Sequence, residues 1–168
     1  MSYFKRATVL LAMGRFRSAL HDLNKVIELK PDFTSARMQR ANVLTKQGLF
    51  EEASQDYNKI IVDQNNGEAR ERLDRIYTII NDLDNAKRAS ANHDFGYAID
   101  VYTQVLEHCP WSTEIHELRS ECYLKLGDIS KAINDIDFLA KLIPDNTEAY
   151  FRLSELHYAM GDAEYALK

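Results

Sequence analysis

The sequence predicts an all-α protein built as a solenoid of antiparallel helix pairs, and three observations support this prediction. Only six glycines and three prolines occur in 168 residues, which indicates long helices and short turns. Glycine, alanine and proline all recur with a shared period of about 34 residues. Between these residues, apolar side chains recur three and four positions apart, as they do on one face of a helix.

The same period appears in three residue types. Gly14 and Gly48 are separated by one period, and so are Gly127 and Gly161. An alanine stands five residues after each of these glycines, and a fifth alanine fits the series with one longer step. That longer step indicates a single insertion of about 11 residues in the third repeat. These alanines are Ala19, Ala53, Ala98, Ala132 and Ala166, and the prolines that share the period are Pro31, Pro110 and Pro144.

Each repeat is interpreted as two helices joined by a turn at its glycine, because glycine readily takes positive φ at the end of a helix. If the glycine is position 15, small residues at positions 8 and 20 allow the two helices to approach closely. Apolar residues at positions 17 and 24 fill the remaining space, and proline at position 32 ends the second helix. The small residues at position 8 are Ala7, Ala41, Ala86, Ser120 and Ser154.

The repeat divides the chain into five units, taken here in order. Residues 1–33 and 34–67 each form one complete unit. Residues 68–112 form a third unit that contains the insertion, and residues 113–146 form a fourth. Residues 147–168 form a truncated fifth unit, in which Gly161 marks the expected turn.

The insertion predicts an extended helix at the start of the third unit. Residues 67–92 are expected to form one helix of about 24 residues, roughly 36 Å long, that stiffly joins two blocks of repeats. The alternative is a loop followed by an ordinary helix. His93 stands where this unit would have its glycine, and Asn65 replaces the second proline, so the pattern is weakest here. The expected apolar face consists of Leu73, Ile76, Tyr77, Ile80 and Leu83.

Composition excludes several classes of function. The net charge is −5 and no basic tract occurs, which argues against nucleic acid as a partner. No segment approaches the ~18 uninterrupted apolar residues of a membrane-spanning helix, so membrane insertion is not expected. The first residues also lack the arrangement of a secretory signal peptide.

The repeat unit resembles the tetratricopeptide repeat, which has a small residue at position 8, glycine at 15, alanine at 20, an aromatic at 24 and proline at 32. The whole chain further resembles ER-luminal co-chaperones that carry a tetratricopeptide array followed by a C-terminal J domain. This family is also named for inhibition of the interferon-induced double-stranded-RNA-activated protein kinase. The segments that carry the resemblance are YFKRATVLLAMGRFRSALHDLNKVIELKPDFTSARMQRANVLTKQG, ELRSECYLKLGDISKAI and DNTEAYFRLSELHYAMGD. No His-Pro-Asp motif occurs, so we expect a fragment lacking the J domain.

The resemblance implies a module that holds unfolded or misfolded client proteins in the ER lumen, with a role in the unfolded protein response. Transfer of the client to the chaperone BiP would use the absent J domain. The alternative is a cytosolic scaffold or adaptor that binds and inhibits a kinase, such as a stress-activated eIF2-alpha kinase. Adaptors of this fold that clamp acidic C-terminal tails need cationic and amide side chains on their first helices. Phe4, Thr8, Glu117 and Glu121 occupy such positions here, so a tail clamp is not expected.

By the same resemblance, the first helix of each unit lines a concave face, and two surfaces are candidates for binding. The first is a shallow apolar groove for clients, unless Phe4 and Leu11 pack against a preceding repeat instead. The second is rich in carboxylates and suits a basic segment of a partner, although a merely solvated face is the alternative. The expected client-binding residues are Phe4, Leu11, Met38, Asn42 and Thr45. The second surface comprises Glu117, Glu121, Phe151, Glu155 and Tyr158.

No catalytic, cofactor-binding or metal-binding motif is found, so an enzyme is not expected. The five histidines, His116 among them, are interpreted as surface residues. Asp135 and Asp137 are interpreted as exposed polar residues on different sides of a helix. Cys109 and Cys122 occur at distant positions of their units and are expected to be two buried thiols rather than a disulfide.

Overall fold

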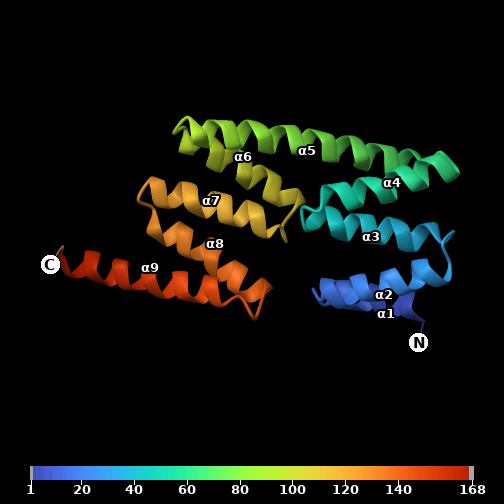
Figure 1. Cartoon of the computed structure of the whole chain (residues 1–168), viewed down its shortest axis with the longest axis horizontal. Coiled ribbons are helices and arrows are strands. Elements are labelled where there is room, and N and C mark those ends of the chain that lie inside the picture. Colours follow the sequence, from blue (N-terminus) through green and yellow to red (C-terminus); the bar gives the residue numbers. More distant parts are fainter. Residues whose placement is uncertain (1, 167–168) are drawn as a thin grey trace. The chain divides into compact units, whose positions relative to one another are not determined.

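The computed structural model describes residues 2–166, with side chains described as far as residue 161, and this part of the chain consists of α-helices joined by short turns (Figure 1). The prediction of an all-α tetratricopeptide-like repeat is therefore confirmed. The chain divides into two compact units, Met1–Ile79 and Ile80–Lys168, and α5 contributes to both. From here on these are called the first unit and the second unit, and the five sequence repeats are called predicted units. The helices are α1 (Tyr3–Ala12), α2 (Phe16–Leu29), α3 (Thr34–Lys46), α4 (Phe50–Gln64), α5 (Gly67–Ala91), α6 (Phe95–His108), α7 (Thr113–Lys125), α8 (Ile129–Leu142) and α9 (Thr147–Ala166).

Within the helix pairs, the same turn joins the first helix to the second. Gly14, Gly48 and Gly127 have φ angles of 71°, 77° and 77°, in the left-handed region. In the first of these turns, the Gly14 N–H donates to the Leu11 carbonyl and the Arg15 N–H to the Leu10 carbonyl. These two bonds define a Schellman motif, which satisfies carbonyl groups left free at the end of the helix. The predicted glycine turns are therefore found at these three positions.

His93 adopts the turn conformation that glycine adopts in the other pairs. Its φ is 62°, and its N–H donates to the Ser90 carbonyl at 3.0 Å. The Asp94 N–H donates to the Ala89 carbonyl at 2.9 Å, which completes the same motif. Asp94 also caps α6, because its side chain accepts from the Tyr97 N–H. The third turn therefore forms without glycine.

The turn expected at Gly161 is not present, because α9 continues through this residue. Ser154, the small residue of the truncated unit, is exposed on α9. The side chain of Ala166 lies outside the described residues.

Small residues form the contact between the paired helices, as the repeat predicts. Ala7 and Ala19 are fully buried in one apolar cluster between α1 and α2. Ala41 and Ala53 are fully buried in a second cluster, which also contains residues of α5. In the second unit, the small residues at the same positions are Ala86, Ala98, Ser120 and Ala132, and each is fully buried.

The predicted extended helix is confirmed, but its buried face differs from the expected one. α5 has 25 residues and no break. Ile79 is buried, with 3% of its surface exposed, whereas Ile80 and Tyr77 are 37% and 56% exposed. Side chains of successive residues on a helix point in directions that differ by about 100° around the helix axis. At the edge of an apolar face, the sequence pattern alone therefore cannot decide which of two neighbouring residues faces the core. The buried residues of α5 are Ala69, Leu73, Ile76, Ile79, Leu83 and Ala86.

In three helix pairs an arginine forms an ion pair with a buried aspartate, a contact that was not predicted from the sequence. Asp22, Asp56 and Asp135, one on each second helix, are at most 3% exposed. Each of these carboxylates accepts two hydrogen bonds from one arginine on the first helix of the same pair, with N···O distances of 2.6–2.9 Å. The planar guanidinium group suits this bidentate contact with a carboxylate. The arginines are Arg6, Arg40 and Arg119. In the third predicted unit, Asn85 and Val101 stand at the corresponding positions.

The arginines also connect neighbouring helix pairs. Arg40 on α3 donates to the side chain of Asn24 on α2 at 3.0 Å. Arg119 on α7 donates to the Thr103 hydroxyl on α6 at 3.1 Å. Each of these guanidinium groups therefore fixes its own pair and orients the pair before it.

The interpretation of Asp135 and His116 as surface residues is wrong. Asp135 is 3% exposed and His116 is 8% exposed. His116 Nδ1 lies 2.9 Å from Asp135 Oδ1, and its Nε2 lies 3.1 Å from the Pro110 carbonyl. A buried carboxylate needs such partners, because it has lost its hydration. Asp137 does lie near the surface, where Lys141 contacts it at 2.6 Å.

No helix in the described part of the chain combines the length and the apolar character needed to cross a bilayer.

We predict that Ala53→Leu destabilises the first unit by about 1–3 kcal/mol, because the larger side chain overpacks the contact between α3 and α4. Ala53 is fully buried there. The free energy of unfolding is measured by urea titration with circular dichroism. Ala12→Leu, at an exposed position of α1, is the matched control and is expected to change stability by less than about 0.5 kcal/mol. Equal stability of the two variants would contradict the account of the helix contact.

We also predict that Asp135 makes the second unit sensitive to acid. Burial alone would raise the pKa of Asp135, but hydrogen bonds from His116 and Arg119 outweigh burial and hold the pKa below its usual value. A carboxyl group with a depressed pKa in the folded state stabilises the protein above its unfolded pKa of about 3.9, and this contribution is lost as the pH falls through the folded pKa.

Urea unfolding of Asp135→Asn tests this prediction between about pH 7 and pH 3. The variant is expected to lose about 1–3 kcal/mol at neutral pH and to depend less on pH in the acidic range. Asp137→Asn, which alters an exposed ion pair, should retain the acid dependence of the unmodified chain. A steep acid dependence that persists in Asp135→Asn would count against this role.

Candidate functional site

The apolar residues of the predicted client-binding surface lie on the first helices of the first unit and are half-buried. Phe4 and Leu11 of α1 pack against the cluster between α1 and α2. The Phe4 ring also lies 4.8 Å from the Phe33 ring, measured between centroids. Met38 of α3 packs against the cluster between α3 and α4. These side chains therefore have an inner face fixed by the core and an outer face that can contact another polypeptide.

The polar residues of the same predicted surface surround a buried tyrosine. Tyr57 of α4 is 1% exposed, and its hydroxyl donates to Asn42 Oδ1 at 2.6 Å. Arg72 of α5 donates to the same oxygen at 2.9 Å. Burial raises the pKa of Tyr57, so the hydroxyl remains a donor. Thr45 donates to the Ala41 carbonyl of its own helix at 2.8 Å.

Asn42 is therefore engaged within the protein. Sequence analysis did not identify Tyr57 and Arg72 as its partners. Residues 42 and 57 occupy positions 9 and 24 of one repeat, and this spacing is the signal that could have revealed the first contact. No signal in the sequence indicates the contact with Arg72, which depends on where the extended helix packs.

The second predicted surface lies on α7 and α9, and all five of its residues are exposed. Glu117 and Glu121 are one turn apart on α7. Phe151, Glu155 and Tyr158 follow one another at one-turn intervals on α9. Phe151 and Tyr158 are 66% and 74% exposed. The structure thus brings aromatic and acidic residues to the same pair of first helices.

Electrostatic interactions connect the carboxylates of α7 and α9. Partial desolvation raises the pKa of Glu117, and repulsion from Glu121, Glu148 and Glu114 raises it further. Arg152 opposes this shift. A cationic group bound near Glu117 would relieve the repulsion among these side chains.

The described side chains include no group of three or more histidine, cysteine, aspartate or glutamate residues arranged to hold a metal ion. Cys109 and Cys122 are free and buried, as predicted. Burial raises the pKa of Cys109 to about 12 and also raises that of Cys122, so neither is an activated nucleophile.

Paired helices of this length, alanine-based contacts and glycine turns define a tetratricopeptide-repeat protein. Residues 4–75 match the tetratricopeptide repeat family. The crystal structure of the P58(IPK) TPR domain superposes on the chain with a TM-score of 0.86 at 41% identity, covering 98% of this chain and 47% of that one.

The chain is homologous over its length to DnaJ homolog subfamily C member 3. It is 43% identical to the human protein over 172 residues and 42% identical to the chicken protein over 176 residues, covering 99% of this chain and 34% of each relative. A tetratricopeptide repeat and J domain-containing co-chaperone from Cryptococcus neoformans is 32% identical over 158 residues, covering 94% of this chain and 30% of that protein. The chain spans about a third of the length of these curated relatives.

We predict that Asn42→Ala destabilises the first unit by about 1–3 kcal/mol, because it leaves the buried Tyr57 hydroxyl without its acceptor. Urea unfolding provides the measurement. Thr8→Ala is the control, since Thr8 is exposed at the same repeat position and its repeat has Leu23 rather than a tyrosine at position 24. A loss of client binding with unchanged stability in Asn42→Ala would instead support direct contact between Asn42 and clients.

Proposed function

We propose that the chain is the polypeptide-holding module of a co-chaperone, which binds unfolded or misfolded client proteins in the ER lumen. In the full-length protein, a J domain would transfer the client to the chaperone BiP. The observation that carries the proposal is the similarity, over 94–99% of this chain, to co-chaperones whose names include a J domain or DnaJ. The location in the ER lumen and the transfer to BiP follow from the family resemblance of the sequence.

The described surfaces are compatible with this role. Unfolded chains expose apolar side chains, and the first helices present half-buried Phe4, Leu11 and Met38 to receive them. Methionine suits a surface that must accept many shapes, because its side chain is flexible and polarisable. Such contacts bury little area each, so the interaction is expected to be weak and broad in specificity.

The test measures binding of the chain to reduced, carboxymethylated lactalbumin and to chemically denatured luciferase, with the native forms of both as negative controls. We predict binding to both denatured proteins. Phe4→Ala combined with Met38→Ala should weaken this binding by about fivefold or more, because two apolar contacts are truncated. Circular dichroism confirms that the variant remains helical.

A matched control replaces two exposed apolar residues on the second helices, Leu29 and Val62, with alanine. These residues are 75% and 81% exposed, and the double variant should bind denatured proteins as the unmodified chain does. Loss of binding in this control, but not in Phe4→Ala/Met38→Ala, would place the client elsewhere. Binding to a folded eIF2-alpha kinase domain without binding to either denatured protein would favour the alternative of a kinase-inhibiting scaffold.

A further inference from the structure

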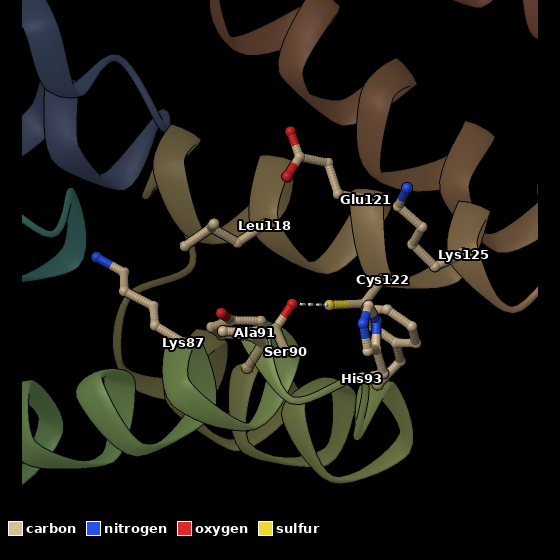
Figure 2. Close-up of a pocket in the computed structure, with 10 residues that line it drawn as sticks. Lys87, Ser90, Ala91, His93, Leu118, Glu121, Cys122 and Lys125 are labelled. Atoms are coloured by element: carbon tan, nitrogen blue, oxygen red, sulfur yellow. Dashed lines mark hydrogen bonds between the residues drawn. The ribbon is translucent and has the colours of Figure 1, made fainter.

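The second unit contains a cavity of about 460 Å³ bordered by α5, α6 and α7 (Figure 2). This volume falls within the range of about 300–1,000 Å³ that is typical of ligand pockets. Ala91, Phe95 and Leu118 supply apolar lining, and Glu121 is an exposed residue at the same cavity. The Ser90 hydroxyl and the Cys122 thiol lie 3.6 Å apart, so these two groups pair with each other. The cavity therefore has an apolar part, one carboxylate that also belongs to the acidic surface of α7, and three basic side chains at its border, Lys87, His93 and Lys125.

A buried hydroxyl without a partner lines the cavity. Tyr102 of α6 is fully buried, and its hydroxyl has no hydrogen-bond partner among the described residues. Burial, and then the nearby Cys122, Glu114 and Glu121 of α7, raise the pKa of Tyr102 to about 12. The hydroxyl therefore remains protonated and available as a donor, and its electrostatic neighbours lie on the helix across the cavity.

The first unit provides an internal comparison for this tyrosine. Tyr57 and Tyr102 occupy the same repeat position, and Tyr57 donates to Asn42, fifteen residues before it. Fifteen residues before Tyr102 stands Lys87, whose ammonium group cannot accept a hydrogen bond and contacts Glu114 at 2.7 Å. A buried donor without an acceptor is rare in folded proteins, so an unpaired hydroxyl at a cavity calls for a partner from outside the chain. An acceptor from outside the chain would complete the arrangement that the first unit completes by itself.

The carboxylates beside the cavity set the charge of the ligand. Glu121 borders the cavity, and Glu117 lies one turn away on α7, where its neighbours Glu148 and Glu114 repel it. Lys87 is engaged by Glu114, Lys125 lines the cavity one turn after Glu121 on α7, and Arg152 acts on Glu117, so three cations stand against the four carboxylates Glu114, Glu117, Glu121 and Glu148. A ligand that brings a positive charge to Glu117 and Glu121 is therefore complementary to this surface.

We propose that the cavity binds an extended client segment in which an apolar residue is flanked by lysine or arginine. The apolar side chain lies against Leu118 and Phe95, and the backbone carbonyl of the segment accepts from Tyr102 Oη. The flanking cationic side chain lies beside Glu117 and Glu121. The identity of the occupant as an unfolded client rests on the proposed function above.

The experiment measures binding of three fluorescein-labelled peptides of equal length by fluorescence anisotropy. The peptides differ only at their centre, which is leucine flanked by lysines, leucine flanked by glutamates, or serine flanked by lysines. The first should bind at least about tenfold more tightly than the other two, and its affinity should fall as salt rises. Glu117→Gln combined with Glu121→Gln should remove most of this salt dependence.

Two variants test the cavity itself. Tyr102→Phe removes only the hydroxyl and should weaken the leucine–lysine peptide by about two- to tenfold, the effect of one hydrogen bond. Tyr97→Phe is the matched control, because Tyr97 lies on the same helix, is 49% exposed and does not line the cavity, and this variant should bind like the unmodified chain. Ala91→Leu places a larger side chain at an exposed residue of the cavity and should weaken binding by about tenfold or more. Tyr102→Phe preserves the ring and Ala91 lies outside the core, so both variants are expected to fold.

The outcomes separate this proposal from the general function. Equal binding of the three peptides, or unchanged affinity in both Tyr102→Phe and Ala91→Leu, would overturn the assignment of the cavity. If denatured proteins still bound the chain in that case, the proposed function would remain. If the chain bound the leucine–lysine peptide as predicted but no denatured protein, the cavity would stand as a peptide site and the client-holding function would fail.

Discussion

The structure depends on the close approach of paired helices at fully buried small residues. Ala7 with Ala19 and Ala41 with Ala53 leave room for the helix backbones to come together in the first unit. Because each first helix packs on its partner through this narrow contact, part of its surface remains exposed even where α3 and α7 also contact the preceding pair. Larger side chains such as Leu23 and Tyr57 fill the space on either side and complete the two clusters. The binding surfaces therefore follow from the same contact that holds each pair together.

Buried arginine–aspartate pairs add a directional constraint to this apolar packing. A bidentate ion pair between the first and second helix tolerates little change in their relative position, whereas alanine contacts alone allow sliding. Removing one partner of such a pair leaves an uncompensated buried charge, so the pairs enforce the arrangement even if they add little net stability. The pair is missing where Asn85 and Val101 replace the charged residues, next to the extended helix and the cavity.

Much of the fold could be predicted from the sequence because a repeated contact leaves a repeated residue. The alanines, the glycine turns and the length of α5 were all accessible in this way. Arg6, Arg40 and Arg119 are separated by the same two intervals as the three prolines, so the ion pairs could also have been found. Which of Ile79 and Ile80 is buried could not be predicted from the sequence, because it depends on how α5 packs rather than on the period of its apolar residues.

The candidate sites were harder to predict from the sequence, because they depend on residues that depart from the repeat pattern. Asn42 was predicted to contact clients, yet its amide oxygen is occupied by Tyr57 and Arg72. Tyr102 occupies the repeat position of Tyr57, but Lys87, which cannot accept a hydrogen bond, replaces Asn42, and only the structure shows that no other described residue accepts from its hydroxyl. The aromatics of α9, Phe151 and Tyr158, are exposed, and their spacing of two helical turns places them on one side of the helix.

Site-specific photo-crosslinking to denatured lactalbumin tests the central claim most directly, namely that the free surfaces of the first helices hold other polypeptides. A benzophenone amino acid is placed at Thr8 of α1 or Glu121 of α7, and at Leu29 of α2 or Val62 of α4 in the controls; all four positions are exposed. The account predicts adducts from Thr8 and Glu121 and little reaction from Leu29 and Val62. Equal adducts from all four positions, or adducts from the second helices alone, would contradict it.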